Sequence, residues 1–228
     1  MPTNATFLDD YLNEMYFCYD LNRDGALDMN ETKEMVKGQM GEMNCDSFSM
    51  TESNLLNGRQ DLFDRLKAMF TTYPGQNVQF KLLYRSSRDY CYPSSFRSKV
   101  SGKAKTVTLM TSEAGEIFGG YLDAVYNPSI DEFQADPKAF LLSLTKNEKY
   151  KIQPENQNNA MYYDNENIIF AFGRDDLSVL AGCVGTTLLF GGNYQLPESL
   201  DYSFGWEPMT YLTNEEAYVF QVSEMETF

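Results

Sequence analysis

The chain has 228 residues, of which 43% are hydrophobic, so it can bury one large core or two small ones. Its formal net charge of −15 disfavours nucleic acid and anionic membranes as partners and favours cations and basic protein surfaces. Histidine is absent, which excludes a Ser-His-Asp triad, a Cys-His pair and histidine-ligated metals. No apolar stretch is long enough to predict membrane insertion.

The twelve residues 20–31 carry the most explicit chemistry of the sequence. Gly25 stands at the sharp turn of this loop, where a side chain would introduce strain, and oxygen-bearing residues alternate around it. Apolar residues recur at helical spacing before and after the loop. Residues 6–40 therefore resemble the EF-hand family, which implies one bound Ca²⁺; the alternative is an acidic surface turn. The expected ligands are Asp20, Asn22, Asp24, the backbone carbonyl of Ala26, Asp28 and Glu31.

A helix is expected next, from Met50 to Phe70, because leucine and phenylalanine form a discontinuous apolar stripe there. Gly58 is a candidate break within this helix. The following stretch, Thr71–Val78, is rich in turn-forming residues and predicts a domain boundary. We therefore expect a helical region at 1–77, containing one EF-hand, and a second domain at 78–228.

The second domain is predicted to be rich in β-strands. Short β-type runs alternate with Gly, Asn, Asp and Pro, a pattern typical of a sandwich or barrel. A short helix is expected at Ser94–Val100, and a helical turn at Asp136–Phe140 because Pro137 suits a first helical position. The expected strands are Phe80–Tyr84, Thr106–Thr111, Glu116–Tyr126, Phe140–Thr145, Tyr150–Ile152, Ala160–Tyr163, Ile168–Phe172, Thr186–Phe190 and Tyr218–Val222.

Several of these segments, in their order, resemble the TLD (TLDc) domain. The likeness covers about residues 78–228 and is most specific in Ile117-Phe-Gly-Gly-Tyr121. It departs from the family pattern at Phe172–Asp176, where the usual glycine-rich turn is reduced. The resemblance implies an α+β protein in which the helical EF-hand region precedes a two-sheet antiparallel β-sandwich with small flanking helices. It also implies no catalytic centre, links to oxidative-stress protection and association with the vacuolar proton pump.

The strongest charge contrast lies within this second domain. Residues 81–105 hold seven basic residues against Asp89 alone, a formal charge of +6, whereas residues 106–228 hold five basic and nineteen acidic ones. This basic segment is either a docking surface for an acidic partner or a partner for the domain's own carboxylates. The adjacent carboxylates Asp175 and Asp176 are expected to be solvated rather than catalytic. Gly119 and Gly120 are expected where two β-layers approach closely.

The four cysteines are widely spaced and form no CxxC pair, which argues against a zinc site or a thioredoxin-like centre. The first residues lack the basic and apolar regions of a secretory signal peptide, so free thiols in a cytoplasmic, reducing compartment are expected. Cys91 lies in the basic segment, where cations could lower its thiol pKa; a buried inert thiol is the alternative. We expect a non-enzymatic, calcium-binding interaction module that docks on protein partners in a large cytoplasmic assembly. The candidate assemblies are the proton pump and a microtubule or ciliary structure. The competing hypothesis is oxidative-stress protection by thiol-based redox activity.

Overall fold

The computed structural model describes residues 52–71, 78–127, 132–163, 167–187, 189–197, 200 and 207–228. All of them belong to one compact unit, Ser49–Phe228. This unit therefore includes residues 52–71, which the sequence had placed with the N-terminal helical region. Among the described residues, no helix is long and apolar enough to cross a membrane.

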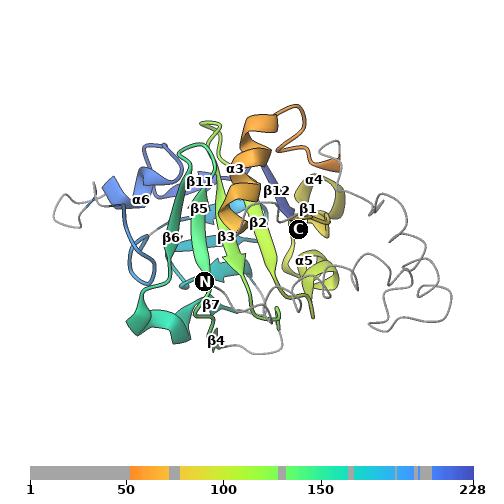
Figure 1. Ribbon diagram of the computed structural model, residues 1–228. Helices are drawn as coiled ribbons and strands as arrows, with labels where there is room; N and C mark the ends of the chain where they lie inside the picture. Colours follow the sequence, from red (N-terminus) through yellow and green to blue (C-terminus); the bar gives the residue numbers. More distant parts are fainter. Residues whose placement is uncertain are drawn as a thin grey trace, which may run out of the picture. The chain divides into compact units, whose positions relative to one another are not determined.

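Two antiparallel sheets of six strands each form the body of the unit (Figure 1). The order in the first sheet is β1-β12-β2-β3-β5-β6, so the strand nearest the C-terminus lies between β1 and β2. Its strands are β1 (Tyr84–Arg85), β2 (Thr106–Thr111), β3 (Ile117–Leu122), β5 (Phe140–Ser143), β6 (Glu148–Lys151) and β12 (Glu224–Thr227).

The second sheet has the order β11-β10-β9-β8-β7-β4. Its strands are β4 (Phe133–Gln134), β7 (Met161–Tyr162), β8 (Ile168–Phe172), β9 (Leu177–Leu180), β10 (Val184–Thr186) and β11 (Val219–Gln221). The short helices α4 (Ser86–Asp89), α5 (Pro93–Val100) and α6 (Glu207–Tyr211) and the 3₁₀ helix η2 (Pro154–Asn159) connect the strands. The expected two-sheet sandwich with small flanking helices is confirmed.

The main core lies between the two sheets. Phe118 of β3 packs against Phe220 of β11 with ring centroids 5.4 Å apart. Gly120, two residues further along β3, faces Phe172 of β8: a Cβ added at Gly120 would lie 2.6 Å from the Phe172 ring. The expectation that Gly120 marks a close approach of two layers is thus confirmed. Gly119 differs, because an added Cβ there would meet the backbone carbonyl of Thr108 in the neighbouring strand.

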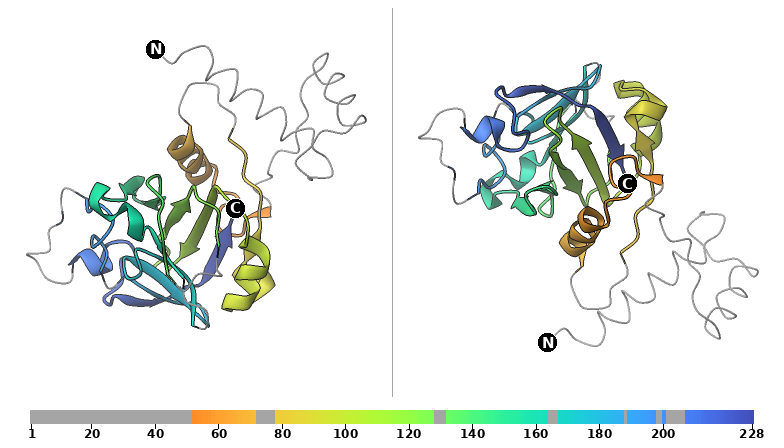
Figure 2. Two further views of the ribbon diagram at one scale, coloured as in Figure 1. Left: turned by 90° about the horizontal axis from the view of Figure 1, so that it is seen from below. Right: turned by 90° about the horizontal axis from the view of Figure 1, so that it is seen from above.

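The opposite face of the first sheet is covered by helix α3 (Gln60–Phe70), which lies across the strands in Figures 1 and 2. The Phe70 ring lies 5.0 Å from Tyr121 and 5.5 Å from Phe140. The Arg65 guanidinium donates to the carbonyls of Leu144 and Thr145, both at 3.0 Å. Because strand side chains alternate, Tyr121 shares this face with Ile117, and Phe118 points to the other side as predicted.

The sequence located most strands, but not all of them. Thr106–Thr111 and Ile168–Phe172 have the predicted bounds, and the expected helix at 94–100 is α5. Strands β4, β9 and β12 were missed, and the strands expected at Phe80–Tyr84 and Thr186–Phe190 are misplaced, because each shares a single residue with β1 or β10. The long helix expected at 50–70 is shorter: it begins at Gln60, after Gly58 takes a left-handed backbone conformation with φ of 72°. The helical turn expected at 136–140 is a plain turn.

Candidate functional site

The basic segment, residues 81–105, runs from the edge of the first sheet to β2. Strand β1 pairs with β12, and α4 follows it directly. Tyr90 ends α4 with φ of 67°, a left-handed conformation that turns the chain away from the helix. Pro93 then opens α5, where its missing N–H is not needed, and the helix buries Phe96 and Val100. The segment is therefore two short helices that present the loop between them.

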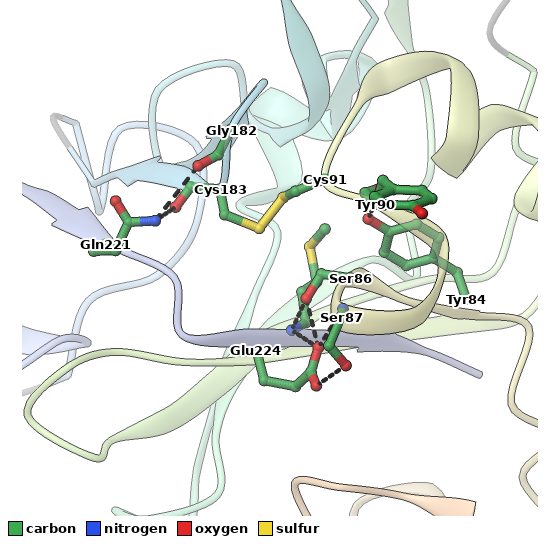
Figure 3. The surroundings of a disulfide bond; sticks show 10 residues. Tyr84, Ser86, Ser87, Tyr90, Cys91, Gly182, Cys183, Gln221 and Glu224 are labelled. Atoms are coloured by element: carbon green, nitrogen blue, oxygen red, sulfur yellow. Dashed lines mark hydrogen bonds between the residues drawn. A yellow bond between two sulfur atoms is a disulfide. The ribbon is translucent and has the colours of Figure 1, made fainter.

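A disulfide between Cys91 and Cys183 ties this loop to the second sheet (Figure 3). Cys183 lies in the turn between β9 and β10, and the N–H of Gly182 donates to the carbonyl of Cys91 at 2.9 Å. The expectation of free thiols is therefore wrong for these two cysteines. Cys91 has no thiol whose pKa nearby cations could lower, because its Sγ is bonded to sulfur. Any two of the four cysteines could form a single disulfide, which gives six possible pairs, and only the tertiary structure selects Cys91 and Cys183.

Two tyrosines flank the disulfide in sequence and are exposed to solvent. Tyr90 is 71% exposed and Tyr92 is 57% exposed, the two highest values among the exposed large hydrophobic side chains of the described residues. By contrast, Tyr84 is buried beneath the loop, and its hydroxyl donates to the carbonyl of Tyr90 at 3.0 Å. Burial, with Asp89 and Glu224 nearby, raises the pKa of Tyr84, so this hydroxyl stays protonated and able to donate.

The cations of the segment divide into paired and unpaired groups. Asp89 accepts from Arg88 at 2.6 Å and lies 3.9 Å from Lys99; the hydrogen bond from Arg88 is the main reason that the pKa of Asp89 is lowered. Lys103 and Lys105 are exposed, and no ion pair between described residues includes either of them. Some cations of the segment are thus neutralised within the domain, and others face solvent. Docking of an acidic partner on the segment stays a prediction.

Beneath the segment, two glutamates of β12 accept many hydrogen bonds. Glu226 is fully buried and accepts from Arg85 Nε at 2.7 Å, from the Asn54 N–H at 2.8 Å and from the Ser53 hydroxyl. Arg85 Nη2 is buried and has no hydrogen-bond partner among the described residues. Within them, Glu226 is the carboxylate that pairs with this guanidinium. The sequence reasoning missed this cluster, because nothing in the sequence shows that residues 53 and 226 are neighbours.

Glu224 occupies the same face of β12, two residues earlier. It accepts from the hydroxyls of Ser86 and Ser87 at 2.5 and 2.6 Å (Figure 3). It also accepts from the Asn54 amide at 3.0 Å. Burial raises the pKa of the Glu224 carboxyl, but these hydrogen bonds lower it by more, so the pKa lies below its usual value. Glu224 and Glu226 thus join β1 and α4 to the chain segment at Ser53 and Asn54.

Asp176 organises a second loop, far from the basic segment in sequence. Its carboxylate accepts from the backbone N–H groups of Gly191, Asn193 and Tyr194 at 3.0 to 3.1 Å and from the Asn193 amide at 2.8 Å. Burial raises the pKa of Asp176 to about 6, against the lowering effect of these donors. The expectation that Asp176 is solvated is wrong: it is fully buried and satisfies the backbone of the 191–194 turn. Its location and partners make it a structural group.

Comparison with known protein families explains the fold. The model of the TLDc domain matches residues 49–228, which is most of the chain. This chain belongs to the TLDc domain family. A search of curated proteins found no match. The family match begins at residue 49, the same residue at which the compact unit begins, so α3 and the Ser53–Asn54 segment are parts of the TLDc domain.

The expected calcium loop lies outside the described residues, and so do all six of its expected ligands. The family comparison shows the TLDc domain and does not show an EF-hand. Within the part of the chain that the structure describes, no group of three or more Cys, Asp or Glu side chains could hold a metal ion. The calcium site at residues 20–31 therefore stays a prediction from the sequence.

Proposed function

We propose that this chain is a non-enzymatic protein-interaction module whose TLDc domain docks on protein partners in a large cytoplasmic assembly. The TLDc domain is known as a protein-interaction domain with links to oxidative stress, which supports this proposal. The family also makes the proton pump one candidate assembly, and a microtubule or ciliary structure is the other. A cytoplasmic location is part of the proposal, although disulfides such as Cys91–Cys183 are commoner in oxidising compartments.

The observation that carries the proposal is the exposed positive charge of an otherwise acidic domain. Lys81, Lys103 and Lys105 are solvent-exposed, while residues 106–228 carry nineteen acidic side chains against five basic ones. When two protein surfaces carry opposite charges, the attraction guides the two proteins together and fixes their relative orientation. Proteins whose surface has the same sign of charge are repelled. We call the surface that carries Lys81, Lys103 and Lys105 the docking face. It would attract a partner with an acidic surface, whereas the acidic side chains of residues 106–228 would repel that partner.

Charge reversal tests this docking face. The full chain is used to capture partners from cell extract by chemical cross-linking, and each partner is quantified by mass spectrometry. The Lys103→Glu variant should lose captured partners, because it reverses a charge on the docking face. The Lys151→Glu variant is the matched control: Lys151 is another exposed lysine and lies on β6, at the opposite edge of the first sheet from β1. Equal loss with both variants would mean that net charge, not this face, controls capture.

We propose further that residues 20–31 bind one Ca²⁺ with about micromolar affinity, as sensor loops of this pattern do. Glu31 would supply two oxygens to the ion, so Glu31→Gln should weaken binding measured by calorimetry. Glu34→Gln, which removes the same charge three residues beyond the loop, is the control. Equal calcium affinity for Glu31→Gln and the unchanged chain would remove the calcium site from this proposal.

Calcium would regulate docking only if it favours one arrangement of the chain over another. We propose a coupling of about 1–3 kcal/mol, the usual range for allosteric pairs of sites. Hydrogen exchange across residues 81–105 should then change when calcium is added. If exchange slows at residues 20–31 alone, the ion has a local structural role and does not regulate the docking face.

The alternative hypothesis, oxidative-stress protection by a reactive thiol, has less support at Cys91, because that sulfur is bonded to Cys183. It is tested by replacing all four cysteines with serine and measuring peroxide protection in cells. Protection that survives these replacements would remove thiol chemistry from the list of functions.

A further inference from the structure

The loop between α4 and α5 exposes two aromatic rings within three residues. Tyr90 and Tyr92 are more exposed than any other large hydrophobic side chain in the described part of the chain. Exposed tyrosine is enriched where proteins contact one another, because its ring buries a large area and loses little side-chain entropy on binding. Phe133, on the edge strand β4, is 40% exposed and provides a comparison elsewhere on the domain.

This loop is held in place before any partner arrives. The disulfide fixes Cys91 between the two tyrosines, and its carbonyl accepts from Gly182 at 2.9 Å. The carbonyl of Tyr90 accepts from the buried Tyr84 hydroxyl and also from the N–H of Tyr92 at 3.0 Å. A surface ordered in advance loses less conformational entropy on binding. The loop therefore has the rigidity that a recognition surface needs.

The charges next to these rings are mainly positive. Arg88 and Lys99 both lie beside Asp89, so two cations share one carboxylate immediately before Tyr90. Across the disulfide, residues 180–187 carry no charged side chain at all. We call Arg88, Tyr90, Tyr92 and Lys99 the tyrosine surface. Asp89 lies between its two cations, so the surface combines exposed apolar rings with one net positive charge.

We propose that the tyrosine surface binds an acidic segment of a protein partner that also carries apolar side chains. The apolar side chains pack on Tyr90 and Tyr92, and carboxylates pair with Arg88 and Lys99. The Cys91–Cys183 bond holds the surface in its binding conformation. A dithiol reductant gives two electrons and two protons to this bond, yields two thiols and becomes a disulfide itself; binding then weakens. The inference rests on the proposed interaction function and names the recognition surface and its control.

Fluorescence anisotropy with labelled peptides tests the proposal on the full chain. One peptide contains glutamate and leucine in equal numbers, and the second replaces every leucine by serine. The glutamate–leucine peptide should bind more tightly than the glutamate–serine peptide. The Tyr90→Ser/Tyr92→Ser variant should lose about tenfold or more in affinity, as expected when anchoring aromatic residues are removed. Phe133→Ser is its control and should bind as the unchanged chain does.

The charge and the disulfide are tested in the same assay. Lys99→Glu should weaken binding of both peptides, whereas Lys151→Glu should change neither. Reductant should weaken binding of the glutamate–leucine peptide several-fold, because the loop must then be ordered on binding. The Cys91→Ser/Cys183→Ser variant should bind as weakly with reductant as without it. Unchanged melting temperatures for the tyrosine and lysine variants show that each variant is folded.

Several results would overturn the proposal. They are unchanged affinity in Tyr90→Ser/Tyr92→Ser, no binding of either peptide by the unchanged chain, and no effect of reductant. A single-stranded oligonucleotide that competes as well as the acidic peptide would show a general polyanion site instead. If cross-linked partners are lost in Lys103→Glu but retained in Tyr90→Ser/Tyr92→Ser, the interaction function stands and the tyrosine surface is not its recognition site.

Discussion

Removal of the Cys91–Cys183 disulfide should destabilise the TLDc domain by a measurable amount. The bond joins residues 92 positions apart and connects the loop after α4 to the β9–β10 turn of the second sheet. In the chain-entropy treatment, a cross-link of this span lowers the entropy of the unfolded chain by an amount worth about 4.6 kcal/mol at 25 °C. The stabilisation measured for disulfides is typically about 2–4 kcal/mol, and we expect a loss of unfolding free energy in this range.

Urea unfolding followed by circular dichroism measures this loss, and thermal unfolding gives a second value. For a domain of this size each kcal/mol lowers the melting temperature by about 2–4 °C, so a fall of about 5–15 °C is expected. The unchanged chain in excess reductant is the control, because it keeps both cysteine side chains and lacks only the bond. Its stability should match that of Cys91→Ser/Cys183→Ser. A loss below about 0.5 kcal/mol in both would refute the reasoning, since the cross-link would then not constrain the unfolded chain.

Three further changes test the interior of the domain. Gly120→Val places carbon against the Phe172 ring and should destabilise by about 1–3 kcal/mol by overpacking; an unchanged melting temperature would contradict the contact. The pKa of Asp176 is about 6 in the folded domain, against about 3.9 in an unfolded chain. Between these values the folded domain holds a proton that the unfolded chain has released, so the contribution of Asp176 to stability should decline as the pH rises from about 4 to 6. An NMR titration that places the Asp176 midpoint below 4 would reverse this sign. Glu226→Ala should destabilise more than Arg85→Met, by about 1 kcal/mol or more in urea unfolding. It leaves a half-buried guanidinium and two further donors without their acceptor, whereas Arg85→Met leaves Glu226 hydrogen-bonded to Ser53 and Asn54; the reverse order would contradict the assigned pairing.

Local sequence was enough to locate the strands with the most regular patterns. Thr106–Thr111 and Ile168–Phe172 are rich in β-branched or aromatic residues, and the structure gives both the predicted bounds. Gly58 correctly marked a break before α3, since its left-handed backbone favours glycine. The order of segments also sufficed to indicate the TLDc family, which the comparison with family models confirmed.

Strands without such patterns were not visible locally. β12 alternates glutamate with methionine and threonine, a composition that does not predict a strand in the interior of a sheet. Burial of a glutamate there is compensated by hydrogen bonds to its carboxylate, and the donors to Glu226 come from distant parts of the chain: Arg85, Ser53 and Asn54. β4 has only two residues, too few to show any alternation.

The sequence by itself determined the acidic balance, the basic segment at 81–105, the strand-rich second domain and the family resemblance. Only the tertiary structure decided that Cys91 pairs with Cys183, that Asp176 is buried, and that α3 belongs to the same unit as the sheets. The physical reason is common to all three. Each depends on contacts between residues far apart in the chain, and composition and periodicity describe only the preferences of neighbours.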